Sequence, residues 1–313
     1  MDTFVQQIVN GFVLGSMYAL VALGYTMVYG IIGLINFAHG DLMMVAALVG
    51  WTCIAWFTAT WPDAPGWLVL CCATSVACLG CAALNIGIER LAYRPLRNSP
   101  RLAPLVTAVG VSMLLQTLAM IIWRPEYKSF PSLLPTEPLG LSLGAGHAVV
   151  SPTQLLTIAV TALSLAALAW LVHGTRLGRA MRATAENPRV AMLMGIPTDR
   201  VIALTFALGA VLAAIAGVLW ASNYGVAHHS MGLLPGLKAF TAAVLGGIGN
   251  LPGAVVGGLV LGLLESMGAG YLGTWTGGWM GSHYADVLAF LVLITVLTLR
   301  PQGLLGERVA ERA

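Results

Sequence analysis

The sequence predicts an all-α, polytopic integral membrane protein with about eight membrane segments. Of its 313 residues, 58% are hydrophobic and only 9% are charged, whereas a soluble domain carries about a quarter charged residues. Several apolar runs have the length of about 20 residues that a helix needs to cross a bilayer. We therefore expect residues 1–313 to form a single transmembrane domain.

The expected membrane segments differ in how continuous they are. Glycine-rich breaks near 30–41 and 245–253 predict discontinuous or re-entrant helices, because interrupted membrane segments in both halves of a chain are typical of a transport pathway. The alternative for the first break is a tight turn between ordinary helices, with Asp41 as the cap of the second. The apolar runs cover 4–29, 31–60, 66–89, 104–123, 153–173, 199–221, 237–270 and 284–299.

The basic residues gather in three groups. Four arginines lie within 90–101, five within 176–200 and three within 300–312, which leaves only three of the 15 basic residues elsewhere. Short loops with excess Lys and Arg face the cytosol. The sequence therefore predicts two cytosolic loops and a cytosolic tail, at about 90–103, 174–200 and 300–313.

This assignment restricts how the chain crosses the membrane. Two runs separate the first two basic groups, so the loop 124–152 is expected outside. Three runs separate the second group from the third, which is an odd number, so we expect 237–270 to be re-entrant or a double pass. The same count places the N-terminus outside, unless one of the first two runs is re-entrant.

The second basic group also carries helix boundaries. Asn187 followed by Pro188 is typical of a helix start, and Gly195 is a typical stop. These signals predict a short helix at about 188–194 with exposed apolar side chains, preceded by a helix at about 178–186. A topological anchor needs only arginines, so two bounded helices indicate a surface that binds another protein.

Motifs for catalysis and nucleotide binding are missing from the sequence. Neither of its two lysines, Lys128 and Lys238, ends a phosphate-binding loop, and no HExxH or GxSxG motif occurs. Cys78 and Cys81 form a CxxC pair without further ligands nearby, which we interpret as small apolar filling. We expect no metal site, no bound cofactor, no enzymatic activity and no nucleic-acid partner.

Four ionisable residues fall within or beside the apolar runs, where charges are costly, namely Asp41, Lys238, Glu265 and Asp286. Lys238 and Asp286 lie near run ends, where extension of the side chain to the interface would explain them. Glu265 lies deeper, and we expect it to pair with a polar group on a neighbouring helix. The sequence shows no series of acidic residues across the membrane, which disfavours an ion-coupled secondary transporter.

Four segments resemble the branched-chain amino acid permease family of ABC importers, and their order and spacing are similar to its shorter, LivH-type subunit. The segments are GLINFAHGDLMMVAALVG at 33–50, RLAYRPLRNSPRLAPLVTAVGVSMLLQ at 90–116, GRAMRATAENPRVAMLMGI at 178–196 and AFTAAVLGGIGNLPGAVVGGLVLGLLES at 239–266. The resemblance extends from about residue 5 to residue 305.

The resemblance implies a multi-pass permease of the bacterial inner membrane that works with several partners. These are a second permease of LivM type, two cytosolic ATPase subunits that bind ATP and Mg, and a periplasmic binding protein. It assigns coupling to the ATPases to Arg179, Arg182, Glu186, Asn187, Pro188 and Gly195. It assigns the translocation pathway to the broken helices, with Asn36, His39, Asp41, Gly246, Gly247, Gly249 and Asn250.

The resemblance implies leucine, isoleucine and valine as the leading substrates. Related systems carry urea, short amides or other small acids, and nothing in the sequence chooses among these substrates. A carboxylate would suit the N-termini of half-helices, and an aliphatic side chain would suit an apolar lumen.

Overall fold

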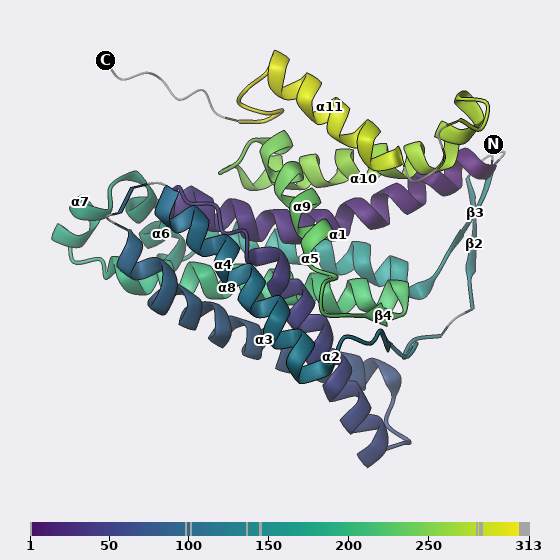
Figure 1. Cartoon of the computed structure of the whole chain (residues 1–313), viewed down its shortest axis with the longest axis horizontal. Coiled ribbons are helices and arrows are strands. Elements are labelled where there is room, and N and C mark those ends of the chain that lie inside the picture. Colours follow the sequence, from purple (N-terminus) through teal and green to yellow (C-terminus); the bar gives the residue numbers. More distant parts are fainter. Residues whose placement is uncertain are drawn as a thin grey trace.

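The computed structural model describes residues 2–97, 99–100, 102–135, 137–143, 146–279, 281 and 284–306. Within this part of the chain, helices form a bundle with two small pairs of strands (Figure 1). The helices are α1 (Asp2–Ile32), α2 (His39–Thr60), α3 (Gly66–Ile88), α4 (Leu102–Trp123), α5 (Pro152–Gly174), α6 (Arg176–Glu186), α7 (Pro188–Leu193), α8 (Thr198–Tyr224), α9 (Leu233–Gly246), α10 (Leu251–Trp275) and α11 (Ala285–Leu299). A π-helical turn, η1 (Glu89–Tyr93), and a 3₁₀ turn, η2 (Arg94–Leu96), extend α3.

The helices confirm the predicted all-α membrane class. Seven helical spans in the described residues are long and apolar enough to cross a membrane, namely α1, α2, α3 with its extension, α4, α5, α8 and α10. Two shorter apolar helices, α9 and α11, accompany them. The run at 237–270, predicted to be re-entrant or a double pass, holds two helices, because α9 ends at Gly246 and α10 begins at Leu251. With 14 residues, α9 is the shorter of the two.

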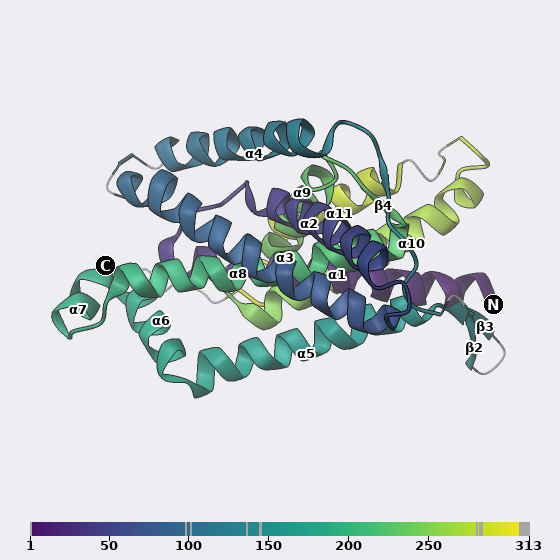
Figure 2. The same cartoon turned by 90° about the horizontal axis from the view of Figure 1, so that it is seen from below.

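The core of the bundle is built around α1 and α8. In their most apolar stretches, 89% of α1 and 78% of α8 are buried within the chain, against 22% of α4 and 17% of α5. Accordingly, α4 and α5 lie on opposite sides of the bundle in Figure 2, with α1 and α8 between them. The peripheral helices are the ones available for contact with lipid.

Small residues let α10 lie directly against α1. A Cβ atom at Gly15 would be 2.8 Å from the Cα atom of Leu259, and one at Gly258 would be 2.8 Å from the Cα atom of Ala19. The glycines of α10 therefore serve close packing of helices inside this chain.

The described basic groups gather at one end of the bundle, which we call the basic end. Arg94 and Arg97 at the end of α3 bind Asp199 at the start of α8. Arg182 of α6 lines one shallow cavity with Gly30 and Gly249. The segment after Arg300 returns to the turn between α9 and α10, where the Leu304 amide donates a 2.8 Å hydrogen bond to the Leu245 carbonyl. Arg101, Arg308 and Arg312 lie outside the described residues.

The other end of the bundle, the opposite end, carries the start of α1 and four short strands. The strands are β1 (Lys128–Ser129), β2 (Leu139–Leu143), β3 (Gly146–Val150) and β4 (Val226–Ala227), which pair as β1 with β4 and β2 with β3. Gln6 of α1 donates to the Val149 carbonyl at 3.0 Å. Three of these strands, β1, β2 and β3, lie in the loop 124–152. They were not predicted, because the short runs of that loop show no sustained alternation of apolar and polar residues.

Candidate functional site

The first predicted break lies between α1 and α2. Gly33 has a φ of 67°, which ends α1, and the chain stays non-helical up to Ala38. The Asn36 side-chain oxygen accepts hydrogen bonds from the Ala38 amide at 3.1 Å and from the Tyr93 hydroxyl at 2.7 Å. Asn36 thus holds the break in shape and fastens it to the π-helical turn after α3.

The next polar residues of the break are buried in the first turn of α2. The ring of His39 meets the ring of Tyr25 edge-on at 4.8 Å between centroids, and a Cβ at Gly24 would overlap this histidine. Asp41 is 1% exposed, and its carboxylate accepts a 3.0 Å hydrogen bond from Gln116 of α4. Asp41 is therefore not the cap of α2, since that position belongs to Ala38.

The start of α2 meets the start of α9 inside the bundle. A Cβ at Gly40 would lie 2.7 Å from the Cα of Gly236 and 2.6 Å from the carbonyl oxygen of Gly232. From this meeting point α2 runs to the opposite end and α9 to the basic end (Figure 1). Phe240 of α9 covers the junction, with its ring 5.8 Å from Tyr25 and 5.6 Å from Phe37. The N-termini of a long helix, α2, and a short one, α9, thus meet at one place inside the bundle, as the ends of discontinuous helices do in many transporters.

The second predicted break forms a turn at the basic end. Gly247 and Gly249 have φ values of 104° and 99°, and Asn250 caps α10 by accepting from the Gly253 amide at 3.1 Å. Gly246 is buried there against the backbone of Gly253. The structure brings Gly249 close to Gly30 at the end of α1.

The half-helix that meets α2 begins at Leu233, ahead of the run that the sequence predicted to start at 237. Gly232 and Gly236 make this meeting possible, and neither was predicted as a site residue from the sequence. The signal was available, because Gly232, Pro235 and Gly236 interrupt an apolar stretch directly after the polar residues His228, His229 and Ser230.

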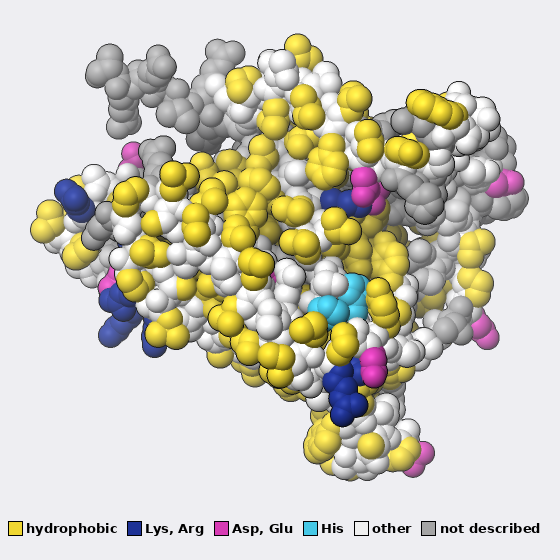
Figure 3. Space-filling view, in the orientation of Figure 1, with side chains coloured by type: hydrophobic (Ala, Val, Ile, Leu, Met, Phe, Trp, Pro, Cys, Tyr) yellow, Lys and Arg dark blue, Asp and Glu magenta, His cyan; other side chains and the backbone are white. Residues whose placement is uncertain are grey.

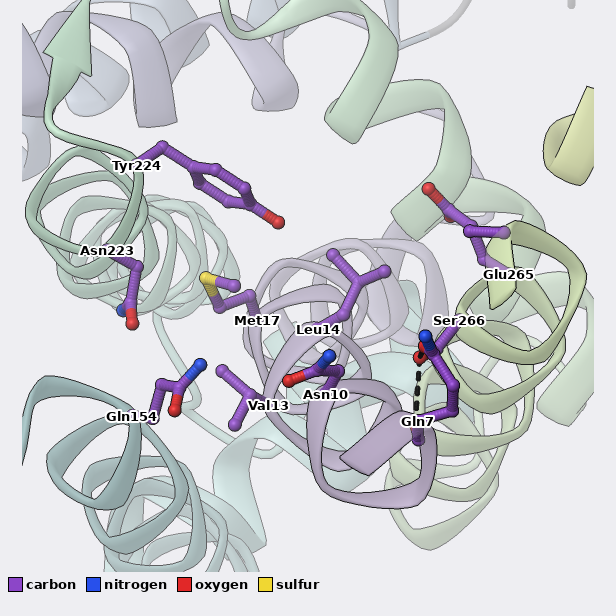
Figure 4. A pocket seen from close by; sticks show the side chains of 11 residues that line it. Gln7, Asn10, Val13, Leu14, Met17, Gln154, Asn223, Tyr224, Glu265 and Ser266 are labelled. Atoms are coloured by element: carbon purple, nitrogen blue, oxygen red, sulfur yellow. Dashed lines mark hydrogen bonds between the residues drawn. The ribbon is translucent and has the colours of Figure 1, made fainter. Parts of the chain in front are cut away.

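A polar cavity of about 400 Å³ lies between α1, α5, α8 and α10 (Figure 4). Its floor is apolar, from Val13, Leu14 and Met17 of α1. Around the floor stand amide, hydroxyl and carboxylate side chains from four helices. They are Gln7, Asn10, Gln154, Asn223, Tyr224, Glu265 and Ser266.

Glu265 links this cavity to a cluster of three charges. Lys238 of α9 donates to Glu265 at 2.8 Å and to Asp286 of α11 at 2.7 Å. The second oxygen of Glu265 accepts from the Tyr18 hydroxyl at 2.8 Å. The expected polar partner for Glu265 is confirmed, whereas Lys238 and Asp286 pair with each other instead of extending alone to an interface.

The histidine pair His228 and His229 lies in the loop that precedes α9. The ring of His228 lies 4.8 Å from that of Tyr127 between centroids, tilted by 54°, and His228 hydrogen-bonds Ser230 at 3.1 Å. Partial burial and the neighbouring His229 lower the pKa of His228. Among the described residues, no group of three histidine, cysteine or acidic side chains is arranged to hold a metal ion.

The segment α6–α7 has the boundaries that its sequence predicts. The Asn187 side chain accepts from the Arg189 and Val190 amides at 3.1 Å each, and Pro188 follows it. At the other end of α7, Gly195 has a φ of 83°, and the Ile196 amide returns to the Ala191 carbonyl at 3.0 Å. This is a Schellman ending, which fixes where the helix stops.

Apolar side chains of α7 project away from the bundle. The exposed fractions are 52% for Val190, 87% for Leu193 and 79% for Met194. On α6, Arg182 binds the Val172 carbonyl of α5, while Arg179 and Glu186 are exposed. A short, well-bounded helix with an uncovered apolar side is a surface suited to another protein.

An ion network joins the start of α8 to the π-helical turn that holds the first break. Arg97 binds Glu89 and also Asp199, the latter at 2.6 Å, and Arg94 binds Asp199 as well. Glu89 is 1% exposed and stands in the π-helical turn that also carries Tyr93. Contacts therefore continue from the start of α8, beside α7, to Asn36.

Comparison with known proteins decides the family. The family model described as "Branched-chain amino acid transport system / permease component" matches residues 7–297. The chain belongs to this permease family. It is 44% identical to the high-affinity branched-chain amino acid transport system permease protein BraD of Pseudomonas aeruginosa, over 99% of this chain and 98% of the relative.

Other members of the permease family match over nearly the same length. The permease protein LivH of Escherichia coli is 44% identical over 99% of this chain and 97% of its own. A probable LivH of Methanocaldococcus jannaschii is 27% identical over 93% and 89% of the two chains. The protein is thus a multi-pass membrane permease component of a transport system, and the family is not catalytic.

Proposed function

We propose that this chain is a membrane-spanning permease subunit of an ABC importer that moves leucine, isoleucine and valine across the bacterial inner membrane. The proposal is supported by the full-length similarity to BraD and LivH, whose names specify high-affinity branched-chain amino acid transport. The energy would come from ATP, bound with Mg by separate ATPase subunits, since this sequence has no phosphate-binding loop.

The observation that carries the proposal is the exposed apolar side of α7. In our account the basic end faces the cytosol, following the positive-inside rule, so that 90–103 and 174–200 are cytosolic loops and 300–313 is a cytosolic tail. Val190, Leu193 and Met194 then enter a groove of an ATPase subunit. The exposed Arg179 and Glu186 flank this contact.

The remaining components would complete the pathway. A second permease of LivM type would pair with this chain in the membrane, and a periplasmic binding protein would deliver substrate at the opposite end. The meeting point of α2 and α9 would line the path, because helix N-termini favour the carboxylate of an amino acid. His39 and Asp41 stand behind this point, and Gly246, Gly247, Gly249 and Asn250 form its exit at the basic end.

Closure of the ATPases would reach the pathway through the ion network. Movement of α7 displaces Asp199, which Arg97 connects to Glu89 in the π-helical turn. Tyr93 of the same turn holds Asn36 at the broken helix. Such contiguous packed and charged contacts are able to carry coupling between distant sites.

Photo-cross-linking tests the docking of α7. A photoreactive phenylalanine analogue at Leu193 should cross-link to an ATPase subunit in membranes that contain the assembled transporter. Leu79 of α3, which is 73% exposed against 87% for Leu193, provides the matched control and should give no ATPase product. Equal ATPase cross-linking from both positions, or from neither, would contradict the assignment of α7.

A further inference from the structure

The polar cavity between α1, α5, α8 and α10 has no part in the function described so far. It lies at the same end as the start of α1 and the first turn of α5, where Gln7, Asn10 and Gln154 line it. The broken helices meet elsewhere, at Gly40 and Gly236. The cavity is therefore a separate feature that substrate would meet first if it enters at the opposite end.

One side of the cavity presents hydrogen-bond donors. The amide nitrogens of Gln7, Asn10 and Gln154 make no hydrogen bond within the described part of the chain, because the bonds of these residues use their side-chain oxygens. In Figure 4 these side chains stand along one edge of the cavity. These nitrogens are therefore free to donate to a bound carboxylate.

The other side presents acceptors and a net negative charge. Lys238 is shared by Glu265 and Asp286, so the three groups together carry one excess negative charge. Tyr224 points its hydroxyl into the same space from α8 (Figure 4). A cation placed near Glu265 would balance this excess charge.

The floor of the cavity is aliphatic. Leu14 of α1 is partly exposed and lines the cavity, and Val13 and Met17 lie beneath it with exposed fractions of 4% and 2%. A volume of about 400 Å³ is in the range of small-molecule sites, which combine an apolar lining with a few polar groups. The amide side, the acidic side and the apolar floor together match a small molecule that has an anionic group, a cationic group and an aliphatic portion.

We infer that this cavity binds a small aliphatic zwitterion in transit, with its ammonium group at Glu265 and its carboxylate at the amides of Gln7 and Asn10. The inference rests on the proposed import function and adds to it a place where the permease itself recognises the substrate. The charge of Glu265 attracts the ammonium group, the amides donate hydrogen bonds to the carboxylate, and α1 contacts the aliphatic side chain of the ligand.

Binding to the purified permease pair in lipid nanodiscs tests the inference. The probes are L-leucine, 4-methyl-2-oxopentanoate, which lacks the ammonium group, and 3-methylbutylamine, which lacks the carboxylate. Saturation-transfer NMR should show binding of L-leucine with an affinity at least about tenfold higher than either analogue, since each analogue forfeits a charged contact.

Substitutions test whether L-leucine binds in this cavity. Glu265→Gln should weaken L-leucine binding about tenfold or more and abolish the preference over 4-methyl-2-oxopentanoate. Glu126→Gln is the matched control, because Glu126 is an exposed carboxylate that also pairs with a lysine, Lys128, at the opposite end. Asn10→Leu leaves the charge cluster intact and provides a second test if Glu265→Gln assembles poorly.

The outcomes separate this inference from the proposed function. Undiminished L-leucine binding in Glu265→Gln and Asn10→Leu, or no binding to the wild-type pair, would overturn the cavity assignment while ATP-driven uptake of leucine by the complete wild-type importer stands. If that importer takes up none of the three branched-chain amino acids, the proposed function fails. In that case alanine and proline serve as probes of the zwitterion site. Both should bind to the wild-type pair and bind more weakly to Glu265→Gln.

Discussion

The hydroxyl of Tyr93 donates a 2.7 Å hydrogen bond to the side-chain oxygen of Asn36. This bond joins the π-helical turn after α3 to the break between α1 and α2. Both residues are buried, with exposed fractions of 2% and 4%. Single π-helical turns are frequent at functional sites, and here the turn connects the basic end with a discontinuous helix.

Removal of this bond should weaken transport more than it weakens the fold. Tyr93→Phe should cost about 1 kcal/mol of stability, and we expect ATP-driven uptake to fall several-fold because the break loses its attachment to α3. Uptake and thermal unfolding of the purified variant measure the two effects. Tyr127→Phe, at a tyrosine that is 71% exposed, is the control, and an equal loss of uptake in both variants would argue against a special role of Tyr93.

Gly195, which follows α7 with a left-handed backbone conformation, should be needed for coupling between the permease and the ATPase subunits. Gly195→Ala places a Cβ at a φ of 83°, which costs about 1 kcal/mol and shifts the end of the docking helix. We expect impaired ATP-driven uptake with normal insertion into the membrane. Gly277→Ala carries a similar strain at a φ of 63° in the turn after α10, at the other end of the bundle, and should retain uptake.

Glu186 of α6 offers a second substitution in the segment α6–α7, one that causes no backbone strain. Glu186→Gln removes one exposed charge, so the fold should be unaffected, and uptake should fall with the stimulation of the ATPases. Membrane content, uptake and ATP hydrolysis are measured together. Normal, fully coupled transport in both Glu186→Gln and Gly195→Ala would refute the coupling role of this segment.

The contact between the starts of α2 and α9 depends on glycines, which have no side chains. Gly40→Ala would place a Cβ 2.6 Å from the carbonyl oxygen of Gly232, so α2 and α9 must separate. Such overpacking costs about 1–3 kcal/mol, which should lower the melting temperature of the detergent-solubilised protein. Gly80→Ala in α3 is the matched control, since nothing lies within 4 Å of its added Cβ. Equal melting temperatures for the two variants would contradict the close contact.

The two arginines of the ion network should differ in their importance. Arg97→Ala leaves the carboxylate of Glu89, which is 1% exposed, without its arginine; loss of one partner from a buried pair costs about 3–5 kcal/mol. Arg94→Ala removes a pair in which both side chains are about half exposed, which is worth less than about 1 kcal/mol. Denaturant unfolding of both variants checks this order, and the reverse order would show that Glu89 does not depend on Arg97.

The sequence predicted most of the architecture because the membrane restricts it. Apolar length located the helices, and the odd number of runs between Arg200 and Arg300 indicated that 237–270 is re-entrant or a double pass, where the structure has the two helices α9 and α10. Local capping rules placed α7 correctly, since Asn187, Pro188 and Gly195 act through backbone contacts within a few residues.

The candidate site was less predictable because it depends on contacts between distant segments. Gly40 and Gly236 meet across almost 200 positions of the chain, and hydropathy alone does not reveal such a pair. The same holds for Lys238, Glu265 and Asp286, which single-residue reasoning treated separately and which form one cluster. Nothing in the sequence indicated the role of Tyr93, because its partner Asn36 is distant in the chain and lies in the break between α1 and α2.

Uptake by reconstituted liposomes tests the central claim most directly. The liposomes contain this chain with its second permease and ATPase subunits, and a binding protein loaded with radiolabelled leucine is supplied on the side of the opposite end. We predict accumulation of leucine that requires ATP on the side of the basic end and persists when ionophores remove all ion gradients. Accumulation by the permease chains alone, driven by a proton or sodium gradient without ATP, would contradict the account.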